Sequence, residues 1–373
     1  MYRRYLVISV LSVLLTLLAV EVALRLLIAL PACDDSLHAR FRQTIDGVSA
    51  DVTYDRDAAG LRTRAGWARP KMPGVTRVLC LGASTTDQAT QSWPDTWCGL
   101  LEEQLNRELT NSGITVEAAS FGRGAMTASQ SAMELDRLLP LYEPDVIVTL
   151  LGVNDITWMR GVESGEASQQ SVCIPKASKL ASICPTAIRL CRLIQRVNSN
   201  LFESAVSYTT TLEWHSDNLP TVRERFRRMT LVDHLDPSAK SLDQFKKAIT
   251  NIAVSGRDKG VGVILLGQPV LWKSNLSEEE QSRLWFAVRT ATGFSRVDAR
   301  SLQTEMGVYN DAQRSIAVQT GVRYVDLEGQ IPKDLRHFFD DCHYTDLGSR
   351  ALAAVILPTV KNAVLERVAV RTP

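Results

Sequence analysis

Residues 146–155 read Val146-Ile147-Val148-Thr149-Leu150-Leu151-Gly152-Val153-Asn154-Asp155. The first six of these residues carry no charge, which is typical of a parallel strand covered by helices on both faces. A glycine ends the run, and the polar side chains of Asn154 and Asp155 follow at once. Because sites in open α/β sheets form beyond the carboxyl ends of the strands, this stretch predicts both a fold class and the place of a site.

The alternation of short apolar strands with amphipathic helices continues on both sides of this stretch. Further strands are predicted at 78–81, 115–119, 261–266 and 322–326, and helices at 97–109, 129–139, 241–259, 309–319 and 346–368. A capping box of Ser241 and Gln244 is expected to open the helix at 241–259. This alternation predicts an α/β fold with three layers, α/β/α, in which a mostly parallel central sheet of flavodoxin-like type lies between helices.

The composition is that of a globular protein. The 373 residues allow one large domain or two of ordinary size, and 45% hydrophobic with 22% charged residues excludes a largely disordered, collagen-like or solenoid chain. With 42 basic and 41 acidic residues, nothing in the composition attracts nucleic acid. The seven cysteines form no CxxC pair and no zinc-type cluster, which predicts neither a metal site nor a dense disulfide framework. Cys80, inside a predicted strand, is expected in the core.

The first 35 residues have the pattern of a membrane segment. Arg3 and Arg4 precede an uncharged apolar stretch at 5–20, and continuation as a helix to Leu30 makes it about 39 Å long. We therefore expect residues 1–35 to be an uncleaved signal anchor, a transmembrane helix with its start in the cytoplasm and the rest of the chain outside, periplasmic or extracellular. The rival interpretation is a cleaved signal peptide, which leads to the same compartment.

Beyond the anchor we assign 36–75 to a linker and lead-in, and 76–373 to the main domain. A stretch at about 157–239 breaks the alternation and is interpreted as an insertion, with helices expected at 185–198 and 219–229. Cys173 and Cys184 lie close together in this stretch, and in an oxidising compartment they would either pair or remain two thiols.

Four segments of the main domain carry groups suited to catalysis. They are Gly82-Ala83-Ser84-Thr85-Thr86 after the first strand, Phe121-Gly122-Arg123-Gly124-Ala125 after the second, Gly152-Val153-Asn154-Asp155 after the third, and Phe338 to Gly348 ahead of the last helix. The last segment places Asp340 three residues before His343. Singly, Ser84 or Asn154 could cap a helix and Gly124 could merely turn the chain. Their joint occurrence in order favours an active site.

Ester hydrolysis by serine needs a nucleophile, a base, an acid that orients the base, and donors for the oxyanion. Ser84 would attack, His343 would be the general base and then the general acid, and Asp340 would fix the imidazole tautomer. The lipase elbow G-x-S-x-G is absent because Thr86 stands at its second glycine, which argues against the ordinary α/β-hydrolase.

With these four segments, the chain resembles the SGNH, or GDSL-like, hydrolase family over roughly residues 76–360. The most specific matches are 152–155 and 340–343. The resemblance implies a catalytic triad and an oxyanion hole built from Ser84, Gly124, Asn154, Asp340 and His343, where Ser84 and Gly124 give backbone amides and Asn154 its side-chain amide. Ala83 replaces the aspartate of the family's eponymous block. Gly122 competes with Gly124, which is favoured because Ala125-Met126-Thr127 continues as the family does.

The turn after the strand at 261–266 contains Gln268 and Trp272. These side chains are expected to line an acyl or sugar pocket, with packing as an equal alternative for Trp272.

The sequence thus predicts a membrane-anchored serine esterase that acts outside the cytoplasm and removes O-acetyl or other short acyl groups from a cell-surface glycan. No cofactor, metal or nucleic acid is expected, and the sequence favours no particular oligomeric state. The glycan preference rests on analogy and compartment. The alternatives are a lipase, lysophospholipase or thioesterase acting on lipid, a glycan O-acyltransferase, and a glycan-binding protein without catalysis.

Overall fold

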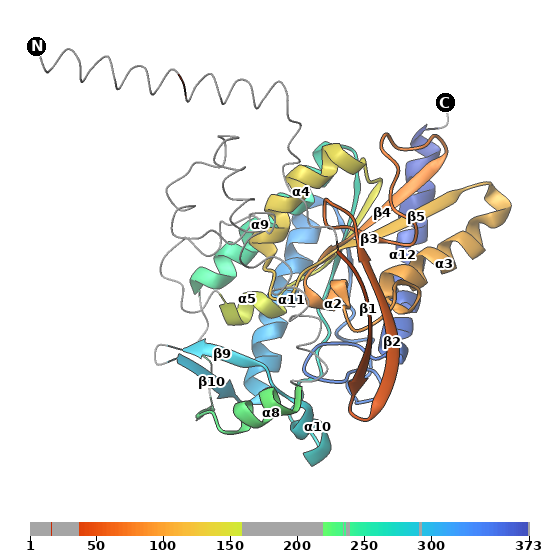
Figure 1. The fold of residues 1–373 in the computed structure, drawn as a ribbon. Coiled ribbons are helices and arrows are strands. Elements are labelled where there is room, and N and C mark those ends of the chain that lie inside the picture. The colour runs from red at the N-terminus through yellow and green to blue at the C-terminus, as the bar shows by residue number, and fades with distance from the viewer. Residues whose placement is uncertain are drawn as a thin grey trace, which may run out of the picture. The chain divides into compact units, whose positions relative to one another are not determined.

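A six-stranded sheet in the order β11-β8-β6-β4-β5-β3 forms the centre of the fold (Figure 1). Its strands are β3 (Arg62–Thr63), β4 (Val75–Gly82), β5 (Thr115–Phe121), β6 (Val146–Leu150), β8 (Gly262–Leu266) and β11 (Arg323–Val325). All neighbours pair in parallel except β3, which runs antiparallel to β5 at the edge. Numbered along the chain, the parallel strands have the flavodoxin-like order 2-1-3-4-5, so the order reverses between β4 and β6.

The computed structural model describes residues 37–158, 219–233, 235, 239–290 and 293–371, together with Thr16. Those from 37 onward belong to one compact unit. Apart from Thr16, the expected anchor at 1–35 lies outside the described residues, as do the expected helix at 185–198 and the pair Cys173 and Cys184. In the part of the chain that is described, no helix has both the length and the apolar character needed to cross a membrane.

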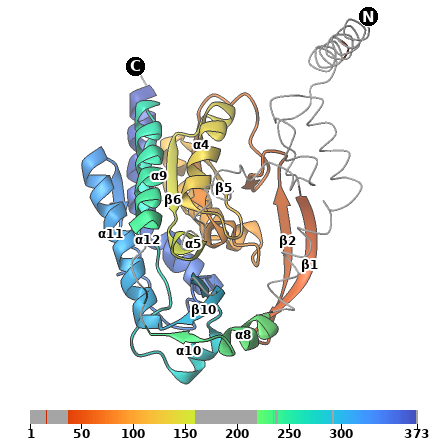
Figure 2. The ribbon, with the colours of Figure 1, turned by 90° about the vertical axis from the view of Figure 1, so that its left-hand side faces the viewer.

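Helices cover both faces of the sheet (Figures 1 and 2). One layer contains α3 (Trp97–Leu109) and α12 (Asp346–Arg371), and the other contains α4 (Ala128–Tyr142), α9 (Ala239–Asp258) and α11 (Ala299–Thr320). The predicted strands and helices are confirmed to within a few residues, except that α11 begins at Ala299 instead of residue 309. Asp298 caps this earlier start by accepting the Ser301 amide.

The capping box predicted for α9 is wrong. The helix begins at Ala239, so Ser241 lies inside its first turn. The Ser241 hydroxyl donates to the Asp155 carbonyl at 2.7 Å and lies 2.8 Å from the Tyr309 hydroxyl. The Ser241 hydroxyl is thus bonded to tertiary partners and does not cap the helix. These bonds tie α9 to α11 and to the segment after β6.

The segment assigned to a linker contains a β-hairpin. Strands β1 (Leu37–Ile45) and β2 (Val48–Arg56) pair antiparallel around the turn Asp46-Gly47, where both residues have positive φ, 51° and 84°. One face of the hairpin packs a small apolar cluster that includes Val52 and Tyr54. Tyr54 of β2 donates its hydroxyl to Asp87 of α2 (Ser84–Asp87) at 2.6 Å, and Figure 2 shows the other end of the hairpin near α8 (Leu219–Arg227).

A second, smaller sheet lies near the hairpin's tip. It has the order β7-β10-β9, with β7 (Leu231–Val232), β9 (Ala287–Thr290) and β10 (Gly293–Val297). The short helix α10 (Glu278–Arg283) leads into it, opened by a capping box of Ser277 and Glu280. Helix α8 falls where a helix at 219–229 is expected. Together these elements place residues 284–286 beside the loop that precedes α12.

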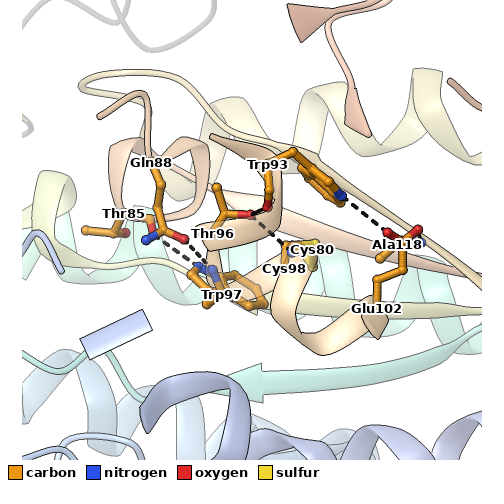
Figure 3. The surroundings of a disulfide bond; sticks show 10 residues. Cys80, Thr85, Gln88, Trp93, Thr96, Trp97, Cys98, Glu102 and Ala118 are labelled. Atoms are coloured by element: carbon orange, nitrogen blue, oxygen red, sulfur yellow. Dashed lines mark hydrogen bonds between the residues drawn. A yellow bond between two sulfur atoms is a disulfide. The ribbon is translucent and has the colours of Figure 1, made fainter. Parts of the chain in front are cut away.

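A disulfide joins Cys80 in β4 to Cys98 in the first turn of α3 (Figure 3). Both cysteines are fully buried, so the expectation that Cys80 belongs to the core is confirmed. Its pairing was not predicted, because 18 residues separate the two cysteines and only the packing of α3 against the sheet brings them together.

Candidate active site

Ser84 stands directly beyond β4, on the turn that opens α2. The preceding strand end is packed too tightly for any side chain at Gly82, since a Cβ there would lie 2.6 Å from the Leu150 carbonyl oxygen. Gly122 plays the same part in the loop after β5, because its Cβ would lie 2.4 Å from the Ala83 carbonyl oxygen. Ser84 itself is partly exposed while its neighbours on the turn are buried. Close packing of three strand ends therefore presents one hydroxyl to the surface.

Side chains from two other elements hold the serine turn from beneath. Trp97 of α3 donates its indole N–H to the Thr85 carbonyl at 3.1 Å, and its backbone amide donates to Gln88 Oε1 at 2.7 Å (Figure 3). Arg62 is fully buried and donates to the carbonyl oxygens of Asp87 and Gln91. Three backbone carbonyls and the Gln88 side chain thus tie the turn and the residues after it to the rest of the fold.

His343 faces this serine from the loop before α12. Its Nε2 lies 2.9 Å from Ser84 Oγ, and its Nδ1 lies 2.8 Å from Asp340 Oδ2. Asp340 is fully buried, and its Oδ1 accepts the backbone amides of Cys342 and His343 at 3.0 and 2.9 Å. The structure therefore joins the three predicted residues in one series of hydrogen bonds that ends at the partly exposed hydroxyl of Ser84.

The pKa values of the two buried residues, Asp340 and His343, are shifted in opposite directions. Burial by itself would raise the pKa of Asp340, but the charge of His343 and the hydrogen bonds to the carboxylate hold that pKa well below its ordinary value. Burial would lower the pKa of His343, yet the negative charge of Asp340 raises it well above 6.5. A carboxylate that stays ionised beside an imidazole that readily takes a proton is the combination that a serine nucleophile needs.

Asn154 lies beyond β6, in the first turn of α5 (Val153–Trp158). Its Nδ2 donates to the Met126 carbonyl at 3.0 Å, which fixes the amide against the loop that carries Gly124. Gly124 is exposed, and no atom would lie within 4 Å of a Cβ there. The contrast with the tightly packed Gly122 assigns different tasks to the two glycines, since Gly122 lets the loop approach the serine turn and Gly124 is open to solvent.

Asp155, the last residue of the stretch 146–155, is buried, and its carboxylate accepts a backbone amide. Its carboxylate oxygens lie 3.1 and 3.2 Å from the Ala128 amide at the start of α4. Burial raises the pKa of this carboxyl to about 7, with the hydrogen bond from Ala128 opposing the shift. Asp155 thereby ties the end of β6 to α4, next to the Gly124 loop.

Comparison with known proteins identifies the family. The model of the GDSL-like lipase/acylhydrolase family matches residues 80–351, which is most of the chain. The chain belongs to this family. It is a carboxylic ester hydrolase with a mostly parallel central sheet, as the sequence predicted. No curated protein matches it.

Several solved structures are similar to this GDSL-like hydrolase in fold. An alpha/beta hydrolase from the metagenome of Lake Arreo, Spain, is 14% identical, with 78% of this chain and 96% of that chain covered and a TM-score of 0.42. A GDSL-like lipase from Bacteroides thetaiotaomicron is 12% identical, with 80% and 94% covered and a TM-score of 0.42. A variant of an acetyl xylan esterase from Geobacillus stearothermophilus is 13% identical, with 76% and 94% covered and a TM-score of 0.40.

Gln268 and Trp272 do not line an open pocket in this hydrolase. Both side chains are fully buried. Gln268 donates to the Tyr344 hydroxyl at 3.1 Å and lies 3.5 Å from Thr85 Oγ1, so it bridges the serine turn and the histidine loop from within. Trp272 donates its indole N–H to Asp341 at 2.8 Å. The packing alternative therefore holds for Trp272, and the pocket expectation is wrong for both because the turn after β8 folds under the site.

Two residues of the site were missed from the sequence. Trp285, between α10 and β9, donates its indole N–H to Asp340 Oδ2 at 2.8 Å. Asp341 is buried and accepts the backbone amides of Trp285 and Phe286 at 2.7 and 3.1 Å. No local pattern marks Trp285, which precedes Asp340 by 55 residues. Asp341 could have been noticed only as the second carboxylate of the Asp-Asp pair.

Asp340, Cys342 and His343 bring an oxygen, a sulfur and a nitrogen within 4.8 Å of one another, a grouping that could hold a metal ion. These same atoms are engaged with each other, since Cys342 Sγ lies 3.8 Å from the His343 Nδ1 that contacts Asp340. Burial raises the pKa of the Cys342 thiol to about 11, whereas a metal ligand must be a thiolate. The grouping is better suited to proton transfer than to metal binding.

Proposed function

We propose that this hydrolase cleaves its ester through an acyl-enzyme formed on Ser84. His343 Nε2 takes the proton of Ser84 Oγ while that oxygen attacks the ester carbonyl carbon, and the imidazolium then gives the proton to the departing alcohol. Asp340 holds the imidazole and stabilises its positive charge. Water repeats the sequence on the acyl-enzyme and releases the acid. The observation that carries the proposal is the pair of contacts at 2.9 and 2.8 Å on the two nitrogens of one imidazole.

The oxyanion hole of the proposed reaction consists of the backbone amides of Ser84 and Gly124 and the side-chain amide of Asn154. These donors belong to the loops after β4, β5 and β6, which are adjacent strands of the sheet. The Asn154 amide is preorganised by its bond to the Met126 carbonyl, which leaves its second N–H to serve a ligand. Preorganised donors of this kind act without rearrangement when negative charge develops on the carbonyl oxygen.

We propose that the natural substrate is an acylated glycan at the cell surface, from which O-acetyl or another short acyl group is removed. The proposed location outside the cytoplasm and the family resemblance support this choice. A transferase would use the same acyl-enzyme but pass the acyl group to a sugar hydroxyl, and a lipid-directed enzyme would prefer long chains.

A series of p-nitrophenyl esters from acetyl to palmitoyl, with Ser84→Ala beside the wild-type enzyme, tests both the mechanism and the chain length. We expect a short-chain optimum and a loss of at least about 10³-fold in kcat for Ser84→Ala. Ser112→Ala, at an exposed serine of a surface turn, is the matched control and should behave as wild type. A long-chain optimum would refute the glycan proposal alone, whereas equal turnover by Ser84→Ala and wild type would refute the acyl-enzyme.

The proposed location is outside the cytoplasm, with residues 1–35 as a membrane anchor. Two observations support it: the basic and then apolar sequence of those residues, and the Cys80–Cys98 disulfide, because disulfides persist in oxidising compartments. A fusion of alkaline phosphatase to the C-terminus should be active in cells. An active β-galactosidase fusion at the same place, with an inactive phosphatase fusion, would refute this location.

A further inference from the structure

The Asp340 carboxylate has an acceptor site that the proposed triad does not use. Oδ1 accepts two backbone amides of its own loop, and His343 Nδ1 lies 2.8 Å from Oδ2 and 3.0 Å from Oδ1. Oδ2 also accepts the indole N–H of Trp285 at 2.8 Å. Trp285 belongs to the segment between α10 and β9. This is the one side-chain donor, other than the histidine, recorded on Asp340 in the described part of the chain.

The Trp285 indole also lies alongside the imidazole. The rings of Trp285 and His343 are parallel to within 2°, with centroids 6.2 Å apart, and Phe339 is inclined by 14° with its centroid 5.7 Å from His343. Trp285 thus donates a hydrogen bond to Asp340 and lies beside His343, the two residues that must stay aligned.

Asp341 secures Trp285 in this place. One of its oxygens accepts the backbone amides of Trp285 and Phe286, and the other accepts the Trp272 indole. The Leu271 amide in turn donates to the Asp341 carbonyl at 2.9 Å. The Asp340-Asp341 pair therefore divides two tasks, since Asp340 orients the histidine while Asp341 fixes the segment that binds Asp340.

Resting on the proposed function, we infer that Trp285 is a positioning residue for the triad: its indole N–H fixes Asp340 Oδ2 opposite His343 Nδ1, and Asp341 holds Trp285 in place. The indole N–H also weakens the attraction between the Asp340 carboxylate and the imidazolium, because a hydrogen bond to Oδ2 draws negative charge away from the imidazole. Without it, Asp340 would stabilise the imidazolium more strongly, and His343 would need a higher pH to become the neutral base. Loss of the donor should therefore both slow the reaction and move its pH dependence.

Few other charged or titratable groups face this carboxylate among the described residues. Its own loop contributes His343, Cys342, Asp341 and Tyr344. The charge of Asp340 is the second cause, after burial, of the raised pKa of Asp341, and it adds to the effect of burial on the raised pKa of Tyr344. From α8, Arg223 donates to the Phe339 carbonyl at 3.0 Å, one residue before Asp340. A substitution confined to Trp285 leaves all of these groups in place.

Trp285→Phe in the full chain tests the inference, because it removes the N–H and retains an aromatic ring. For hydrolysis of p-nitrophenyl acetate we expect kcat to fall about 2- to 10-fold and the acid limb of kcat/KM to move up by about 0.5 to 1 pH unit. Trp93→Phe is the matched control, since Trp93 donates its indole to Glu102 at 3.2 Å outside the site. Its acid limb should stay at the wild-type pH.

Asp341→Asn provides a second test. An amide accepts donors only on its oxygen, so the variant side chain cannot hold both the amides at 285–286 and the Trp272 indole, and kcat should fall by about the same factor as in Trp285→Phe. Because this variant also removes a negative charge next to Asp340, which by itself would lower the pKa of His343, its readout is kcat and not the acid limb. If Trp285→Phe keeps the wild-type limb and Asp341→Asn keeps the wild-type kcat while turnover still depends on Ser84, Trp285 is a packing residue and this inference fails alone. If turnover does not depend on Ser84, the proposed function fails instead.

Discussion

His343 Nε2 lies 2.9 Å from Ser84 Oγ, although 259 residues of sequence separate them. Two buried glutamines beyond the serine turn reinforce this approach. Gln88 donates to Ser349 Oγ and Gln91 donates to Asp346 Oδ1, each at 2.7 Å, so the serine turn is bonded to the start of α12. The nucleophile and the histidine loop are therefore held together by side-chain hydrogen bonds that do not involve the catalytic atoms.

The raised pKa of His343 predicts an enzyme that gains activity with pH. The imidazole must be neutral to accept the serine proton, and its pKa lies well above 6.5 because of the charge of Asp340. Activity should therefore be low at acidic pH and rise through that pKa, with Asp340 ionised throughout. A profile of kcat/KM for p-nitrophenyl acetate, followed at the isosbestic wavelength of nitrophenol, should reach half its maximum above pH 6.5. A midpoint below that value would contradict the prediction.

Two glycines of one loop should respond differently to alanine. Gly122→Ala places a Cβ 2.4 Å from the Ala83 carbonyl and 2.7 Å from the Asp87 amide, so the serine turn must shift. Because misplacement of about 1 Å can cost about 10²-fold in rate, kcat should fall by a factor of that order. Gly124→Ala meets no atom within 4 Å and retains the backbone amide, so its loss should be far smaller. Equal losses in both variants would show that the packing at Gly122 does not position Ser84.

Asn154→Ala should remove one oxyanion donor. Loss of such a donor costs about 10² to 10³ in kcat with little change in KM, because the oxyanion exists only in the transition state. Single-turnover and steady-state kinetics with an acetyl ester measure this split. If KM rises and kcat is unchanged, Asn154 binds the ground-state substrate and is not an oxyanion donor.

The tip of the hairpin is joined to the histidine loop through Arg223. This arginine pairs with Asp46 at 2.5 Å and donates to the Phe339 carbonyl at 3.0 Å, with only 7% of its side chain exposed. Asp46→Asn leaves that charge poorly compensated, so we expect a loss of about 1 to 3 kcal/mol in the free energy of unfolding. Urea denaturation measures the loss. Asp51→Asn, at an exposed position of the same hairpin, should change it by less than about 0.5 kcal/mol, and equal effects would contradict the role of the pair.

The Cys80–Cys98 disulfide should contribute measurably to stability. A closed loop of this size restricts the unfolded chain by about 3 kcal/mol. The double variant Cys80→Ala with Cys98→Ala should lose about that amount relative to the oxidised enzyme in urea denaturation. Dithiothreitol should lower the stability of wild type and leave the double variant unchanged. A response of the double variant to dithiothreitol would assign the effect to other cysteines.

Local patterns were sufficient to predict the alternation of strands and helices and the four segments that carry the candidate catalytic residues. A charge-free run such as 146–151 predicts a buried strand by itself, and the polar residues that follow it must lie at the same edge of a parallel sheet. The hairpin at 37–56 also has a local signal, since Leu37, Ala39 and Phe41 alternate with polar residues ahead of an Asp-Gly turn. The hairpin therefore corrects the assignment of this segment to a linker.

Local sequence is therefore enough to single out Ser84, Asn154, Asp340 and His343 as candidate catalytic residues and to predict the kind of sheet that carries them, because strand periodicity and motif spacing are local properties. The pairing of Cys80 with Cys98, the burial of Trp272 beneath the site and the hydrogen bond from Trp285 to Asp340 depend instead on the tertiary fold. In each of these contacts, the sequence around one residue gives no indication of its partner. They form because the packing of helices and loops onto the sheet brings together residues that are distant in sequence, and that packing is a property of the whole fold.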